Sequence, residues 1–203
     1  MRLNELKSVN YGRQELFSGL QKDWFSMCNL YKKANLSAPI ENIGKVNNFQ
    51  IQRFNSQREM IRIVDTINNK SVGFITTNKV TGTKNVREPH CAIKLEYSGM
   101  NIVTKVYAFL IKKLNYILWT RHQQTPQGQK LWERLAKISG IIVFAYDTKK
   151  KKAISLDKDD IFGEDAIFGS FGNSGDKYGK SELTFGENEY ANYYMTLVAA
   201  KDN

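Results

Sequence analysis

The sequence is short of cysteine and histidine. Among its 203 residues are two cysteines, Cys28 and Cys91, and two histidines, His90 and His122. Two cysteines cannot build a disulfide framework, and the four side chains do not follow the spacing of a zinc site. We therefore expect neither a disulfide framework nor a bound metal, and we interpret Cys91 as a small buried residue.

Long apolar runs are also missing. No run approaches the ~20 residues that a membrane-spanning helix needs. The N-terminal stretch MRLNELKSVNYGRQELF lacks the apolar segment of a secretory signal. We therefore expect a protein without a membrane partner, located in a reducing cytoplasm.

The charge of the chain is large and unevenly distributed. The composition, with 41% hydrophobic and 25% charged residues, is that of an ordinary globular protein, and the net charge is +10. Residues 157–203 carry a net charge of −6, so residues 1–156 carry +16. A basic body of this kind suits nucleic acid, the phosphates of CoA or acidic proteins, or it merely keeps the protein in solution. Both interpretations remain open at this point.

The chain divides into an extension and a main domain. Apolar residues at helical spacing predict a helix over about 13–34, and the stretch after it, with Pro39 and Gly44, predicts a loop. We assign residues 1–45 to an N-terminal helical extension and residues 46–203 to one domain. Within that domain the segment 157–190, rich in glycine, aspartate and phenylalanine, predicts a long loop.

The first half of the domain has the pattern of β-strands. Alternating or β-branched apolar residues predict strands at 49–54, 59–66, 71–77 and 90–97. The second and third of these strands are separated by the turn sequence INNKS, so we expect them to form an antiparallel hairpin.

The second half mixes helices with strands. Apolar residues recur at three- and four-residue steps over 102–114, which predicts a helix. Thr125 and Pro126 suit the start of another helix, Trp132 lies on its apolar stripe, and Gly140 follows its end. Strands are predicted at 116–120, 141–147 and 193–200, the last returning beside 141–147. The order β-β-β-β-α-β-α-β plus a C-terminal strand predicts an α/β (α+β) fold with a mixed, mostly antiparallel sheet and flanking helices.

Three segments carry a resemblance to a known family. They are IKLEYSGMNIVTKVYAFLIKK (93–113), YILWTRHQQTPQGQKLWERLAK (116–137) and TLVA (196–199). In element order and in these strings the chain, over about residues 48–200, resembles the GNAT N-acetyltransferases, especially divergent members encoded by bacteriophages. The resemblance implies a GNAT-like fold and an acetyl-CoA cofactor without a metal, and it places the protein in the host cytoplasm if a phage encodes it.

In that family a glycine-rich loop between a strand and a helix holds the CoA pyrophosphate against backbone N–H groups. The matching stretch keeps Gly99, but the usual arginine is Ser98, the second glycine is Asn101, and a small residue is replaced by Val103. Asparagine can still adopt a left-handed backbone conformation. The resemblance implies that the cofactor contacts Leu95, Tyr97, Gly99, Met100, Asn101, Ile102, Val103 and Thr104.

Candidate catalytic residues are few. Acetyl transfer requires that an amine lose a proton, and Glu96, predicted at the end of the strand bordering the cofactor, is the best carboxylate for this step. His122 follows a predicted strand end near the expected substrate entrance. Many family members use a tyrosine as general acid on the later helix, where this chain has Trp132. Trp132 has an N–H donor but no acidic proton, and we interpret it as a core residue.

Two functions follow from these observations. The first is an acetyl-CoA-dependent N-acetyltransferase that acts on an amine of a protein or a small molecule. The second is an inactive protein of the same fold that binds a host protein or nucleic acid through its basic body. The fold alone does not decide between them, and the sequence does not name the acceptor or the oligomeric state.

Overall fold

A computed structural model of the chain describes residues 40–54, 59–80, 82–120, 126–159, 161–162 and 195–202. These residues form one sheet of nine strands, one short 3₁₀ helix and two α-helices. The strands are β1 Ile40–Val46, β2 Phe49–Phe54, β3 Glu59–Asp65, β4 Lys70–Lys79, β5 Val86–Ile93, β6 Ile117–Trp119, β7 Ile141–Asp147, β8 Lys152–Ser155 and β9 Met195–Lys201; the helices are η2 Leu95–Tyr97, α2 Ile102–Leu114 and α3 Pro126–Ala136.

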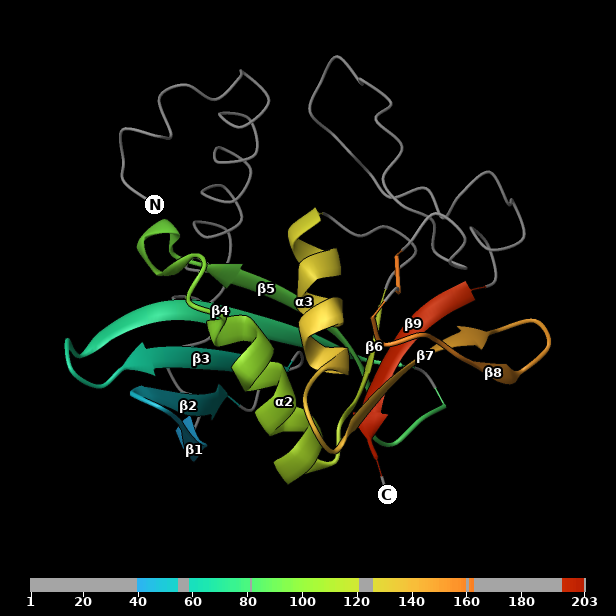
Figure 1. Cartoon of the computed structure of the whole chain (residues 1–203). Helices are drawn as coiled ribbons and strands as arrows, with labels where there is room; N and C mark the ends of the chain where they lie inside the picture. Colours follow the sequence, from blue (N-terminus) through green and yellow to red (C-terminus); the bar gives the residue numbers. More distant parts are fainter. Residues whose placement is uncertain are drawn as a thin grey trace, which may run out of the picture.

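The first five strands form an antiparallel meander (Figure 1). The β3–β4 hairpin is confirmed, with Glu59 opposite Thr77 and Asp65 opposite Lys70. Two of the connections are tight turns that contain asparagines at positive φ, Asn47 at 52° and Asn69 at 51°. Asparagine adopts this conformation more readily than most residues, so these turns are encoded locally.

The chain then passes to a parallel strand by way of a helix. Strand β5 leads through η2 into α2, and α2 leads into β6, which pairs with β5 in parallel. Strand β9 lies between β6 and β7 and is antiparallel to both, so the sheet order is β1-β2-β3-β4-β5-β6-β9-β7-β8. The predicted return of the last strand beside β7 is confirmed, and the α+β class with a mixed, mostly antiparallel sheet is confirmed with it.

Three local predictions differ from the structure. Strand β1 occupies residues that we expected to form a loop. Gly44, which we interpreted as a loop residue, lies within this strand at a β-bulge, where the register with β2 shifts. Strand β5 ends at Ile93, four residues before the predicted end, because residues 95–97 form a 3₁₀ helix. Strand β8 was not predicted, because it begins within a run of four lysines, which lacks the apolar pattern of a strand.

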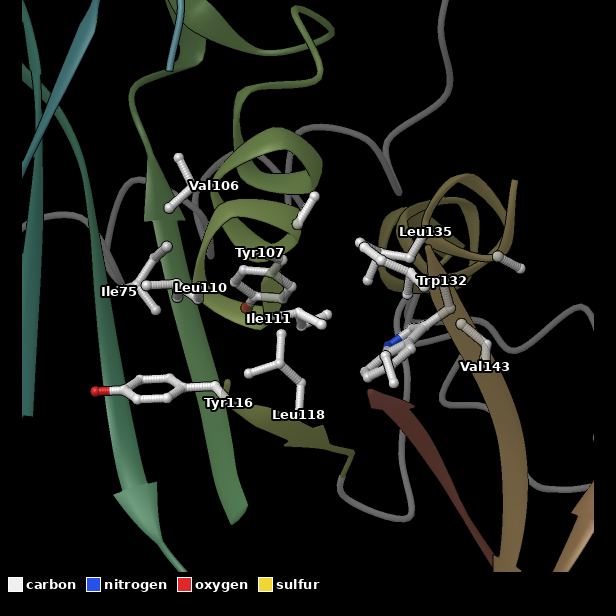
Figure 2. Packing of buried hydrophobic residues seen from close by; sticks show 14 of the residues in the cluster. Ile75, Val106, Tyr107, Leu110, Ile111, Tyr116, Leu118, Trp132, Leu135 and Val143 are labelled. Atoms are coloured by element: carbon white, nitrogen blue, oxygen red, sulfur yellow. The ribbon is translucent and has the colours of Figure 1, made fainter. Parts of the chain in front are cut away.

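Helices α2 and α3 lie together against the sheet and enclose the main core (Figures 1 and 2). The stripe predicted for α2 is confirmed, because Val106, Leu110 and Ile111 are each fully buried. Trp132 on α3 has an exposed fraction of 3% and packs in the same core, as predicted. The helix predicted over 13–34, the capping residue Thr125 and most of the predicted loop 157–190 lie outside the described residues.

Candidate functional site

The candidate site lies along β5 and at the start of α2. The parallel ladder of β5 with β6 has the pairs Val86–Ile117 and Arg87–Leu118, and in the described ranges no further pair joins the two strands. Strand β6 ends at Trp119, whereas β5 continues to Ile93 along β4. Within the described residues, the ladder with β6 therefore covers the start of β5, and the second half of β5 leads to the start of α2.

The connection from β5 to α2 has the backbone geometry of a tight turn. Gly99 has a φ of +83° and Asn101 a φ of +56°, and both angles fall in the left-handed region. A β-carbon added to Gly99 would meet no atom within 4 Å. The turn precedes Ile102, because Ile102 and Val103 already belong to α2 as the helix predicted over 102–114 requires, and the space around Gly99 is open.

The N-terminus of α2 is suited to an anion. Asn101 is its N-cap but makes no side-chain capping bond, and its first turn contains no acidic residue. The first N–H groups of an α-helix have no partner within the helix, and the helix dipole places partial positive charge there. Backbone groups of this kind bind phosphate or carboxylate when an anion reaches them.

The residues assigned to the cofactor divide into two sets. Leu95 and Met100 are exposed by 56% and 52%, so their side chains are accessible to a ligand. Ile102 and Thr104 are 3% and 5% exposed, and Ile102 belongs to the core cluster. The buried pair can therefore contribute to ligand binding mainly through the backbone.

Tyr97 anchors the connection to the neighbouring hairpin. Its hydroxyl donates to Asp65 Oδ2 at 3.0 Å, and its ring meets Phe49 edge-on at a centroid distance of 6.3 Å. Asp65 also accepts from the Asn68 amide at 2.7 Å and from the Ile67 N–H at 2.9 Å. The Asn68 amide first, and the other donors with it, lower the pKa of Asp65. Burial, and then the Asp65 carboxylate, raise the pKa of Tyr97.

Of the two candidate catalytic residues, the structure describes one. Glu96 is not at the end of β5 as expected but in the 3₁₀ helix beyond it, where it is exposed. His122 lies outside the described residues. The expectation that Cys91 is buried is wrong, because Cys91 is exposed on β5. Tyr107 of α2 lies beside it, and burial first, with the Cys91 thiol second, raises the pKa of Tyr107.

A polar cluster near the start of β5 was not identified from the sequence. Glu59 accepts hydrogen bonds from the hydroxyls of Thr77, at 2.6 Å, and of Tyr116. It also forms ion pairs with Arg53 at 3.6 Å and Arg87 at 3.5 Å, and the Arg87 guanidinium lies 4.9 Å from the centre of the Tyr116 ring. Burial raises the pKa of Tyr116, and Glu59 adds to the rise.

The strand patterns did contain a signal for this cluster. Arg53 follows the inward positions Phe49 and Ile51, and Glu59 precedes the inward positions Ile61 and Ile63. A charged residue at an inward position of a strand must be paired, so opposite charges on adjacent strands predict an ion pair. The cluster ties β2 to β5 and to the connection before β6.

Comparison with protein-family models, with curated proteins and with solved structures found no match for this chain. The described part of the chain has no helix that is long and apolar enough to cross a membrane. In the same ranges, no three His, Cys, Asp or Glu side chains are grouped so that they could hold a metal ion.

Proposed function

We propose that the chain is an acetyl-CoA-dependent N-acetyltransferase with a GNAT-like fold. One observation carries the proposal: β5 and the parallel strand β6 are connected by a helix whose N-terminus, after a turn with two residues at positive φ, follows the end of β5. This arrangement offers a strand edge and an anion site side by side. CoA combines an extended arm containing amide groups with a pyrophosphate, so the two features match the two parts of one ligand.

The strand edge is defined by the hydrogen bonds on the other side of β5. The N–H of Lys94 donates to the Val72 carbonyl at 2.9 Å, and the N–H of Val80 donates to the Val86 carbonyl at 3.1 Å. The even-numbered backbone groups of β5 therefore face β4, and the odd-numbered groups face the side of β6. Pro89 is one of these residues, in keeping with the preference of proline for strand edges. An extended ligand with amide groups can pair with such an edge as an added strand.

The N-terminus of α2 would hold the second part of the ligand, its pyrophosphate. With the arm of CoA along β5, its pyrophosphate would reach the first turn of α2 and the open space beside Gly99. The side chains of Leu95 and Met100 would flank the same ligand. Asn101 supports the proposal because it supplies the left-handed backbone conformation that a second glycine supplies in the family.

The reaction would be a direct acyl transfer. The nitrogen of a neutral amine attacks the thioester carbonyl, a C–N bond forms, the C–S bond breaks, and CoA leaves as its thiol. The amine must lose a proton, and we propose Glu96 and His122 as the acceptors. Glu96 is exposed, so a proton that it accepts can pass to solvent.

A pair of glycine variants tests the cofactor site. Gly99 and Gly82 have similar φ values, +83° and +78°, and neither has an atom within 4 Å of an added β-carbon. Replacing either by valine should therefore impose a similar backbone strain, while only Gly99→Val adds bulk beside the first turn of α2. Acetyl-CoA at ~100 times its Kd should stabilise the native chain and Gly82→Val by about 2.7 kcal/mol, seen as a rise in melting temperature.

In this test Gly99→Val should show little or no rise. The proposal is wrong if millimolar acetyl-CoA leaves the melting temperature of the native chain unchanged. It is also wrong about the site if both variants respond as strongly as the native chain.

A further inference from the structure

A second group of buried apolar residues lies apart from the main core. Phe54, Met60, Phe74 and Ala92 form this group, which we call the second cluster, and their exposed fractions are 0%, 4%, 1% and 3%. They come from the four neighbouring strands β2 to β5. Phe54 is opposite Met60, and Phe74 is opposite Ala92, so the cluster is continuous across these strands.

The second cluster faces away from α2 and α3. Successive side chains of a strand point to opposite faces of the sheet. Met60 is followed by Ile61 and Phe74 by Ile75, and both isoleucines belong to the main core together with the buried residues of α2 and α3. Met60 and Phe74 therefore point to the other face, and neither α-helix that the structure describes packs on it (Figure 1).

A buried apolar sheet face needs a covering layer, because neighbouring side chains shield a residue at its sides and not from above. The Arg62 guanidinium lies 5.8 Å from the centre of the Phe54 ring and covers part of it. Phe74 and Met60 belong to the same face and are almost fully buried. The cover must come from a part of the chain beyond the described ranges or from another molecule.

The connections of most other segments lead to the opposite face. The loop 163–194 joins the described chain at Phe162 and Met195, and both residues belong to the main core. Residues 121–125 lead into α3, whose buried side chains lie in the same core. The four residues 55–58 are too few to cover four strands, which span about 14 Å at a spacing of about 4.8 Å.

The N-terminal segment starts beside the second cluster and has a matching apolar stripe. It joins the sheet at Ile40, which pairs with Phe54. In its sequence Leu16, Leu20 and Trp24 follow one another at four-residue steps, as on one face of a helix. At a rise of 1.5 Å per residue such a stripe would be about 12 Å long, close to the width of the four strands.

We propose that the apolar stripe of residues 13–34 packs on the second cluster and closes this face of the sheet. The N-terminal extension then belongs to the folded domain, because the domain without it would expose two phenylalanines and a methionine. The proposal does not depend on the acetyltransferase activity.

Photo-crosslinking in the full chain tests the proposal. The photoreactive residue p-benzoylphenylalanine is placed at position 24, in place of Trp24. In a matched control it replaces Lys22, which would lie about 200° away around a helix. Mass spectrometry of the digested products identifies the segment that is linked. A mixture of unlabelled and ¹⁵N-labelled chains shows whether a link joins one chain or two.

Position 24 should link to peptides of β2 to β5 that contain the second cluster, within one chain, and position 22 should give few or no such links. Links from position 24 to residues 163–194, to α2 and α3 or to a second chain would overturn the proposal. The absence of any link from position 24 to β2–β5 would overturn it as well.

Urea unfolding gives a second test that needs no unnatural residue. Met60 and Ile61 are neighbours in β3 on opposite faces, so Met60→Val and Ile61→Val form a matched pair. The shift in urea midpoint caused by Trp24→Ala should be smaller in the Met60→Val background than in the native chain, because both substitutions remove the same contact. In the Ile61→Val background the shift should stay close to its native size. Equal shifts in all three backgrounds would contradict the proposal.

Discussion

At the scale of single residues, Glu59 joins several polar side chains of the sheet. It receives hydrogen bonds from Thr77 and Tyr116 and ion pairs from Arg53 and Arg87, although the chain reaches these residues at widely separated positions. Loss of one of these donors would leave part of the half-buried carboxylate unsatisfied. The cluster therefore links four strands and the start of β6 in one polar contact.

Tyr116→Phe should destabilise the protein by about 1.5–3 kcal/mol, because the hydroxyl donates to a charged group. Urea unfolding of the native chain and the variant measures the difference. In a Glu59→Gln background the same substitution should cost less, since the charge that strengthens the bond is gone. Equal costs in the two backgrounds would show that the hydroxyl and the carboxylate do not act together.

Asp65 gives the protein a pH-dependent contribution to stability. Its pKa is lowered in the folded state, first by the Asn68 amide and then by backbone and Tyr97 donors. The contribution is therefore complete above the unfolded pKa of about 3.9 and is lost as the pH falls through the lower folded value. Asp65→Asn should flatten the acid side of the stability curve measured by urea unfolding between about pH 6 and pH 3. If the free energy of unfolding of Asp65→Asn fell with decreasing pH as steeply as that of the native chain, this account would be contradicted.

At the scale of secondary-structure elements, the sequence predicts the helices and strands whose signals lie within the segment itself. The period of apolar residues predicted α2 and its bounds, and alternation with turn residues predicted β2, β3 and β4. Strand β1 was missed because Gly44 and Pro39 resemble loop residues, and its identity depends on pairing with β2. The place of β6 in the sheet has no local signal, since β6 pairs with β9, about 80 residues later in the chain.

The role of Gly44 is likewise visible only in the packed structure. Its φ is +151°, and an added β-carbon would lie 2.5 Å from Cζ of Phe109 on α2. Gly44→Ala should therefore destabilise the protein by about 1–3 kcal/mol through overpacking between β1 and α2. Chemical denaturation measures the change.

A second substitution separates steric conflict from backbone strain in this prediction. Phe109→Leu should recover part of the loss caused by Gly44→Ala, because it removes the ring atoms that meet the new β-carbon. If Phe109→Leu recovers none of the loss, the contact with Phe109 is not what requires glycine at position 44.

At the scale of the whole molecule, the nine-stranded sheet has β5 near its middle and the β7–β8 hairpin at its edge (Figure 1). The proposed cofactor site uses backbone groups of β5 and of the first turn of α2, with the open space next to Gly99. The hairpin has exposed lysines at 149–152. Binding of CoA at the proposed site can therefore be distinguished from charge-driven binding at the hairpin by where CoA protects the chain.

Amide hydrogen exchange with and without CoA tests the central claim most directly. Exchange detects ligand protection segment by segment, so it reports the position of binding as well as its occurrence. We predict that CoA slows exchange in the segment from Cys91 to Thr104, which includes the edge of β5, the turn at Gly99 and the first turn of α2. Slowed exchange confined to residues 148–152, or no change at saturating CoA, would contradict the proposed cofactor site.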